Sequence, residues 1–337
     1  MDKRELGAGG PQVAPIGLGC MGMSWGYAES HRDDAASVDV IRRALDAGVE
    51  LLDTAAVYGD GHNEELVGRA IADRRNEVVV ATKGGLVVDD LATKQMHRDG
   101  RPETLRRQVE ESLARLGVDR IDLYYLHRID PDVPVEESWG ALAELVAEGK
   151  IDRIGLSEVS IAQAEIAHAI HPVAAIQSEL SLWTRDPLGQ PVADASAGGS
   201  AGAGTDAGGD LLAWTRDHGV AFVPFAPLGR GYLTGTLAAD GFEDGDFRAT
   251  NPRFAAEAFA QNQAITDEVA RIAQAHDATP AQVSLAWLLG LSANIIPIPG
   301  TRSGTHLAEN LAATGLHLTE EERLRLDRLP AAHGSRY

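Results

Sequence analysis

The chain has 337 residues, of which 44% are hydrophobic, and a formal net charge of −20. The hydrophobic share is sufficient for a sizeable core, and the negative charge makes nucleic acids and anionic membranes unfavourable partners. Residues 1–7 lack the apolar stretch of a signal peptide, and no apolar run is long enough to span a bilayer. The single cysteine, Cys20, cannot form an intrachain disulfide and fits a reducing compartment, so we expect a cytoplasmic protein.

Apolar runs and amphipathic segments alternate along the chain. Eight runs are apolar throughout, as in strands buried on both faces, and cover residues 16–20, 49–53, 78–83, 121–127, 151–157, 173–177, 220–225 and 294–297. The segments between them predict helices at residues 34–47, 63–74, 102–116, 135–147, 161–170, 210–218 and 280–289. This alternation predicts an α/β fold, a (β/α)₈ TIM barrel with its active site at the C-terminal ends of the strands. We expect one barrel domain over residues 1–337.

Two segments bear on this fold prediction. Residues 17–22 contain G-x-G-x-x-G, the phosphate loop of doubly wound folds, but no amphipathic helix begins at its last glycine. We therefore favour the barrel. Residues 187–210 are rich in Gly and Ala without periodicity, which predicts a flexible insert above the catalytic face. We favour a neutral expansion there over a substrate lid, because long surface insertions are readily tolerated.

Four polar residues lie just past apolar runs in the first 130 residues of the chain. Asp53, Lys83 and His127 each end a predicted strand, and Tyr58 follows Asp53 by five residues. Because the carboxyl ends of barrel strands meet at one mouth, we expect these four side chains to lie together.

A carboxylate, a phenol, an ammonium and an imidazole can move protons together. A phenol has an unperturbed pKa of about 10, which an adjacent ammonium lowers. Asp53 would hold Lys83, and Lys83 would tune Tyr58. A neutral imidazole at His127 could orient a carbonyl oxygen, and the set would protonate an alkoxide as carbonyl reduction requires. Each residue alone could be structural, but all four at one mouth favour a functional interpretation.

Three motifs resemble those of the aldo-keto reductase family. They are Asp53-Thr54-Ala55-x-x-Tyr58-Gly59-x-x-x-Asn63-Glu64-Glu65, Lys83-Gly84 and Leu126-His127-Arg128. The resemblance covers residues 6–332 apart from the insert, and is closest to bacterial and plant single-barrel reductases. It implies a (β/α)₈ barrel, NADPH bound without a Rossmann motif and a small carbonyl substrate. It also implies that Tyr58 is the general acid, that Lys83 and Asp53 set its pKa, and that His127 orients the carbonyl.

The resemblance also implies a set of cofactor-binding residues. Ser157 and Gln177 would hold the nicotinamide carboxamide, and Phe225 would occupy the stacking position. Arg302 would pair with the 2′-phosphate, since a guanidinium can bind a doubly charged oxyanion bidentately. His306 lies where many relatives have Arg or Lys, so NADH is the alternative cofactor. The full set is Gly19, Cys20, Met21, Asp53, Ser157, Glu158, Gln177, Phe225, Ala226, Leu228, Gly229, Arg230, Thr301, Arg302, His306, Glu309 and Asn310.

Other features leave alternatives open. No set of residues has the spacing of a metal site. The chain could be a non-catalytic nicotinamide-binding sensor or regulatory subunit, because fold does not fix function. It could also be a Schiff-base aldolase using Lys83, although Asp53 would keep that lysine charged. The physiological substrate and the choice between monomer and homo-oligomer are open. Candidates for substrate contact are Trp25, Tyr27, Val57, Arg128 and Trp183.

Overall fold

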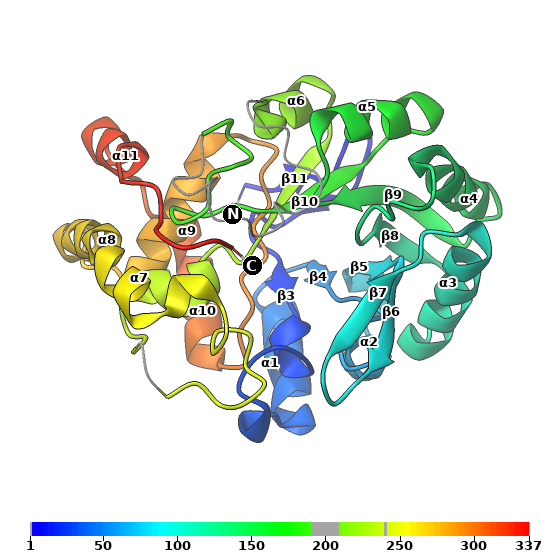
Figure 1. Ribbon diagram of the computed structural model, residues 1–337, viewed down its shortest axis with the longest axis horizontal. Coiled ribbons are helices and arrows are strands. Elements are labelled where there is room, and N and C mark those ends of the chain that lie inside the picture. The colour runs from blue at the N-terminus through cyan, green and yellow to red at the C-terminus, as the bar shows by residue number, and fades with distance from the viewer. Residues whose placement is uncertain (1, 191–208, 239–240, 337) are drawn as a thin grey trace.

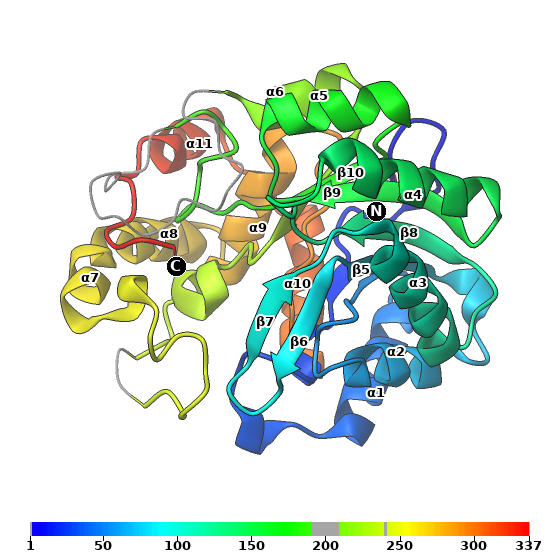
Figure 2. The same cartoon turned by 45° about the vertical axis from the view of Figure 1, so that its right-hand side comes forward.

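The computed structural model describes residues 2–190, 209–238 and 241–336. Seven parallel strands form the central sheet, in the spatial order β11-β10-β9-β8-β5-β4-β3, and helices surround it (Figures 1 and 2). The strands are β3 (Leu18–Gly19), β4 (Leu51–Asp53), β5 (Val79–Gly84), β8 (Ile121–Leu126), β9 (Ile151–Ser157), β10 (Ala175–Glu179) and β11 (Ala221–Phe225). The helices are α1 (Asp34–Asp46), α2 (His62–Ile71), α3 (Pro102–Leu116), α4 (Val135–Ala147), α5 (Ile161–Ile170), α6 (Leu211–Asp217), α7 (Ala256–Gln261), α8 (Gln263–Ala275), α9 (Pro280–Leu291), α10 (Gly304–Ala312) and α11 (Glu320–Asp327).

The eighth predicted strand closes the barrel as an extended segment with a broken ladder. On the β11 side, the backbone N–H of Ile296 donates to the Phe222 carbonyl oxygen at 2.8 Å. On the β3 side, the carbonyl oxygen of Pro297 accepts from Gly17 at 2.9 Å. Pro297 and Pro299 have no N–H to donate back toward β3, so only half of a regular ladder forms there. The prediction of a (β/α)₈ barrel is confirmed in this form.

Apolar side chains form two main buried clusters, one inside the barrel and one outside it. Inside the sheet, one buried cluster includes Leu51, Leu123, Tyr125 and Ile296. The hairpin of β1 (Arg4–Glu5) and β2 (Gln12–Val13) adds its own buried side chains to this cluster. A larger cluster lies between the strands and the surrounding helices. The strands are therefore buried on both faces, which explains why they are apolar throughout.

The predicted elements agree with the observed ones within about three residues, the usual uncertainty of boundaries. The bounds of α3, α4 and α5 are as predicted. The sequence did not indicate the antiparallel hairpin of β6 (Leu86–Asp90) and β7 (Gln95–Arg98), which extends away from the barrel sheet in Figure 2. Its residues are half-buried or exposed, so it lacks the apolar run that marked the barrel strands.

Asn63 joins two loops at the barrel mouth and does not cap α2. The N-cap of α2 is Gly61, which has a φ of 91°, and Asn63 is buried within the first turn. Its Nδ2 atom donates to the Cys20 carbonyl oxygen at 2.9 Å, and its Oδ1 atom accepts from the Thr54 hydroxyl at 2.6 Å. Asn63 therefore ties the loops after β3 and β4 together.

Two further expectations bear on the whole chain. In the described part of the chain, no helix has both the length and the apolarity needed to cross a membrane. The predicted insert at 187–210 falls mostly on residues 191–208, outside the described residues, so its character stays a prediction.

We expect Gly155→Ala to lower the free energy of unfolding by about 1–3 kcal/mol, the usual cost of overpacking a core. Gly155 lies in β9, and an added Cβ would lie 2.6 Å from Tyr125 Cδ1 and 2.7 Å from the Ala175 carbonyl oxygen. Urea denaturation followed by circular dichroism would measure the change. Gly140→Ala in α4 is the matched control: nothing outside its own helix lies within 4 Å of the added Cβ. The free energy of unfolding of the control should rise by about 0.4–1 kcal/mol. Equal stabilities of the two variants would contradict the explanation by overpacking.

Candidate active site

The four polar residues singled out in the sequence come together at the carboxyl ends of the strands. Asp53 ends β4, Lys83 is the second-to-last residue of β5, His127 follows β8, and Tyr58 lies between β4 and α2. The Lys83 Nζ atom donates to Asp53 Oδ1 at 2.6 Å and to the Thr54 carbonyl oxygen at 2.8 Å. The same atom lies 3.4 Å from the Tyr58 hydroxyl oxygen. The rings of Tyr58 and His127 meet edge to face, with centroids 5.9 Å apart.

The Lys83–Asp53 pair is buried and charged. Burial alone would lower the pKa of Lys83, but the Asp53 carboxylate and the Tyr58 hydroxyl group together outweigh burial and raise this pKa. Gln177 Nε2 donates to the second Asp53 oxygen, Oδ2, at 2.7 Å, so both carboxylate oxygens are hydrogen-bonded. Lys83 is thus an ordered ammonium at neutral pH, which makes it a poor nucleophile.

The pKa of Tyr58 is raised, whereas the sequence analysis expected it to be lowered. Burial raises this pKa above 10.0, and the charge of Lys83 lowers it only in part. The physical reason is the loss of hydration of the buried phenol, and the charge of the Asp53 carboxylate raises this pKa further. The expectation of a lowered pKa is therefore wrong. A phenol with a raised pKa keeps its proton at neutral pH and can donate it.

His127 is a neutral imidazole beside this phenol. Burial, followed by the positive charges of Arg128 and Lys83, holds the pKa of His127 well below 6.5. Its Nδ1 atom has no hydrogen-bond partner among the described residues. A neutral imidazole next to a protonated phenol can orient a carbonyl oxygen without adding a charge.

The two residues expected to hold a nicotinamide carboxamide are neighbours across strands. Ser157 at the end of β9 pairs in register with Gln177 in β10. Arg128 Nη1 donates to the Ser157 hydroxyl at 3.0 Å and to the His127 carbonyl oxygen at 2.6 Å. Arg128, expected only as a substrate contact, therefore links the backbone of His127 to the end of β9. The cofactor roles of Ser157 and Gln177 stay predictions.

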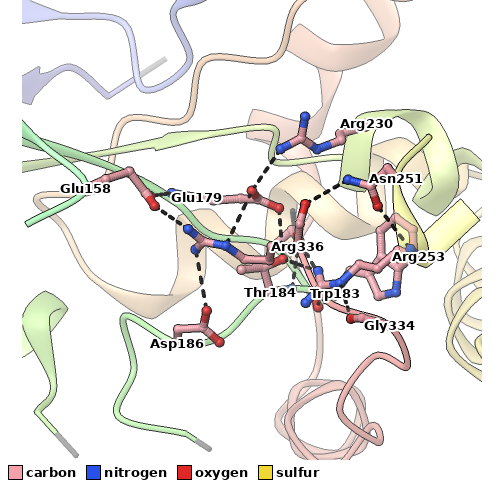
Figure 3. A network of polar contacts seen from close by, with 11 residues as sticks. Glu158, Glu179, Trp183, Thr184, Asp186, Arg230, Asn251, Arg253, Gly334 and Arg336 are labelled. Carbon is pink, nitrogen blue, oxygen red and sulfur yellow. Dashed lines mark hydrogen bonds and ion pairs between the residues drawn. The ribbon is translucent and has the colours of Figure 1, made fainter. Parts of the chain in front are cut away.

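The side chain of Glu158 is directed toward the C-terminal tail. Glu158 has a left-handed φ of 54°; its carboxylate pairs with Arg336 and accepts from the backbone N–H of Glu179 at 2.8 Å. In Figure 3 the same guanidinium also lies near Glu179, at 3.9 Å, and Asp186, at 3.4 Å. Arg230 Nη2 contacts the Glu179 carboxylate at 3.2 Å. Glu158 and Arg230 thus belong to an ion-pair network, and their predicted cofactor contacts stay predictions.

The loop after β11, which carries several of the predicted cofactor-binding residues, has an unusual backbone. Phe225 ends the strand, and Ala226, Gly229 and Arg230 have φ values of 46°, 57° and 56°. A Cβ added at Gly229 would lie 2.7 Å from Trp183 Cε3, so glycine is required by both conformation and contact. The 3₁₀ helix η4 (Gly229–Thr234) begins at this glycine, directly after Leu228.

The predicted adenosine-phosphate turn lies beside the first loop of the barrel. Gly19 at the end of β3 forms a parallel bridge with Gly300, and Arg302 Nη1 donates to the Ala28 carbonyl oxygen at 3.2 Å. Ser303 caps α10 by accepting from the His306 backbone N–H at 3.3 Å. The same two segments carry the remaining predicted residues Cys20, Met21, Thr301, Glu309 and Asn310.

The candidate substrate residues fall into separate groups. Trp25 and Val57 are buried in one small apolar cluster with Tyr58, against which side chains of the β6–β7 hairpin pack. Trp183 instead stacks on Tyr232, with ring centroids 4.3 Å apart. Trp25 and Val57 are therefore better placed to line the space near the phenol, whereas Trp183 packs within the structure that supports η4.

Sequence reasoning missed the β6–β7 hairpin and Phe247 at the mouth. The Phe247 ring meets both Trp25 and Tyr27 edge to face at 6.4 Å. Lys94, in the hairpin turn with a φ of 58°, lies 5.9 Å from the Trp25 ring and 5.8 Å from the Phe247 ring. The two short polar strands around Lys94 could have indicated a hairpin, but no local signal placed Phe247 there.

The described residues contain no candidate metal centre. Within residues 2–190, 209–238 and 241–336, no group of three or more His, Cys, Asp or Glu side chains could hold a metal ion.

The sequence matches known proteins over nearly the whole chain. A model of the Aldo/keto reductase family matches residues 15–330. "Probable aldo-keto reductase 1" of Glycine max is 37% identical, over 94% of this chain and 86% of that protein. "Aldo-keto reductase str7" of Strobilurus tenacellus is 40% identical, over 92% of this chain and 87% of that protein.

Solved structures with a similar fold also belong to such proteins. The glycerol dehydrogenase of Gluconobacter oxydans has a TM-score of 0.82 and 31% identity, over 97% of this chain and 94% of that one. An aldo-keto reductase of Klebsiella pneumoniae, solved in complex with NADPH, has a TM-score of 0.71 and 26% identity, over 100% of this chain and 98% of that one. The barrel fold and the family match together define the protein as an α/β-barrel oxidoreductase. The chain belongs to the aldo/keto reductase family.

We expect Asp53→Asn to lower the free energy of unfolding by about 3–5 kcal/mol, because it leaves the buried Lys83 ammonium without a counter-charge. Chemical denaturation at pH 7 would measure the loss. Asp39→Asn is the matched control: Asp39 pairs with Arg43 at the surface, with side chains 57% and 63% exposed. Such a pair contributes about 0–1 kcal/mol. A loss in Asp53→Asn no larger than in the control would show that the buried pair does not stabilise the fold.

Proposed function

We propose that the protein reduces aldehydes or ketones to alcohols with a hydride from NADPH, and that Tyr58 is the general acid. The observation that carries this proposal is the buried chain of contacts from Asp53 to Lys83 at 2.6 Å and from Lys83 to Tyr58 at 3.4 Å. Carbonyl reduction creates an alkoxide oxygen that must receive a proton. A protonated phenol beside a fixed ammonium can donate that proton and stabilise the developing negative charge.

The neighbouring residues support separate parts of this chemistry. His127, neutral because burial lowers its pKa, would hydrogen-bond to the carbonyl oxygen and orient it toward Tyr58. Asp53 keeps Lys83 charged, which argues against the Schiff-base aldolase, since an aldolase needs a neutral lysine amine. Trp25 and Val57, packed near the phenol, would contact the substrate.

NADPH would supply the hydride. The Klebsiella pneumoniae relative was solved with this cofactor, and Gln177, one of the predicted contact residues, hydrogen-bonds to Asp53. Ser157 and Gln177 are next to the Asp53–Lys83 pair, while Arg302 lies in the turn before α10. An extended cofactor could therefore have its nicotinamide near Tyr58 and its adenosine near α10. We also propose that the chain is one barrel domain with an insert at about 187–210.

We expect Tyr58→Phe to lower kcat for reduction of an activated aldehyde such as a nitrobenzaldehyde by about 10²–10⁴-fold, the usual contribution of general acid catalysis. The affinity for NADPH should change little, because the substitution removes only the hydroxyl group. NADPH absorbance at saturating cofactor would measure the rate.

The matched control is Tyr124→Phe. Tyr124 also lies on a barrel strand, but its side chain packs in the cluster between strands and helices, so the rate should be unchanged. Full turnover by Tyr58→Phe would contradict the assignment of the acid. Tight NADPH binding by the wild type, with no turnover across a panel of aldehydes and ketones, would instead favour a nicotinamide-binding sensor.

We expect the rate of the chemical step of reduction to be independent of pH between about 7 and 9 and to fall only in strongly alkaline solution. A general acid works while it is protonated, and the pKa of Tyr58 is raised above 10.0 by burial. His127 should cause no change in this rate near neutral pH, because its pKa is well below 6.5. Single-turnover kinetics across pH would measure the profile. A fall in rate centred near pH 7 would contradict the role of a buried, protonated phenol.

A further inference from the structure

Arg32 has two buried donors without a partner. It follows the 3₁₀ helix η2 (Glu29–His31) and precedes α1, and its side chain is 17% exposed. The Nε and Nη2 atoms are buried and have no hydrogen-bond acceptor within the described part of the chain. The Nη1 atom lies 3.3 Å from Glu29, whose side chain is 65% exposed. Buried donors that lack acceptors are costly, so this guanidinium is suited to an acceptor from outside the chain.

A second guanidinium contacts the loop that carries Arg32. Arg302 donates to the carbonyl oxygen of Ala28, which belongs to the same loop as Arg32. Burial lowers the pKa of Arg302, and the largest electrostatic contribution that adds to this is the positive charge of Arg32. The two like charges repel each other, and an anion bound between them would be attracted to both.

The acidic residues near these arginines are engaged elsewhere. The Glu243 carboxylate accepts from the backbone N–H of Ser30 at 3.1 Å and also from its hydroxyl group. The Asp246 carboxylate accepts from the Ala28 N–H at 3.1 Å and pairs with Arg248 at 2.7 Å. These carboxylates organise the loop of residues 28–32, and neither accepts from the unpartnered donors of Arg32.

We infer that Arg32 and Arg302 together bind the 2′-phosphate of NADPH, so that Arg32 is a further residue that determines cofactor specificity. This inference rests on the proposed function and deepens it. A phosphate monoester carries a charge of about −1.5 to −2 at pH 7 and three acceptor oxygens, which suit two guanidinium groups. NADH has a hydroxyl group at this position and gains little from them. His306, where many relatives have Arg or Lys, is exposed, and Arg32 supplies the second cation from the other side of the turn.

The test is to measure dissociation constants of NADPH and NADH by tryptophan fluorescence for the wild type, Arg32→Gln, Arg302→Gln and the double variant. We expect Arg32→Gln to raise the Kd of NADPH about tenfold, or about 1.4 kcal/mol, with little change for NADH. The double variant should lose less NADPH affinity than the product of the two single fold-changes, because both residues contact one phosphate. Arg32→Lys should restore part of the affinity, since it keeps the charge but not the bidentate geometry.

Arg107→Gln is the matched control. It removes the same charge from α3, but its side chain is 55% exposed and pairs with Glu111, so screening should leave both dissociation constants nearly unchanged. Adenosine 2′-monophosphate and adenosine 5′-monophosphate serve as probes of the phosphate position alone, and only the first should bind more weakly to Arg32→Gln.

Two outcomes would overturn the inference. One is an unchanged ratio of NADPH to NADH affinity in Arg32→Gln, which includes an equal loss of both affinities and would indicate a purely structural role. The other is a wild type that binds NADH as tightly as NADPH. Failure of the proposed function is distinguishable, because a wild type that prefers NADPH through Arg32 yet reduces no carbonyl compound would leave the two-arginine site intact.

Discussion

The buried ion pair between Lys83 and Asp53 is the interaction on which the rest of the site depends. Removing two charges from water is costly, and the pair is tolerated only with good geometry and further hydrogen bonds. Thr54 and Gln177 supply these bonds. The partners come from β4, β5 and β10, so the barrel must be closed in register before the pair is satisfied. The same closure places Tyr58 beside the ammonium, which means that stability and chemistry share one structural requirement.

Closure in turn depends on an irregular eighth segment. The prolines at 297 and 299 break its ladder with β3, yet their carbonyl oxygens still accept from Gly17 and Gly19. A regular strand is therefore not needed at this seam, and the close approach of Gly19 to Gly300 joins the two ends of the sheet. Arg32 and Arg302, distant in sequence, consequently belong to adjacent loops. The seam that completes the barrel also brings the Arg302 guanidinium against the loop of Arg32.

The sequence predicted the parts of the molecule that depend on local pattern. Apolar runs marked the barrel strands because both of their faces are buried, and polar residues directly after those runs marked Asp53, Lys83 and His127. It could not predict contacts that depend on the closed fold. The direction of the Tyr58 pKa shift depends on burial and on the charge of the Asp53 carboxylate. The pairing of Glu158 with Arg336 joins residues far apart in the chain, and no periodicity indicates it.

Positive charge is arranged around the mouth in two different ways. At the C-terminal tail, Arg336 is matched by Glu158 and Glu179, so a phosphate there would have to compete with buried carboxylates. At the seam, Arg32 has donors that no described residue accepts. The net charge of −20 opposes phosphate only at short range, because the Debye length is about 8 Å at physiological ionic strength. Local donors therefore decide where an anion binds. An acidic barrel can then prefer the more highly charged dinucleotide, because the additional phosphate is stabilised only where it contacts the two guanidinium groups.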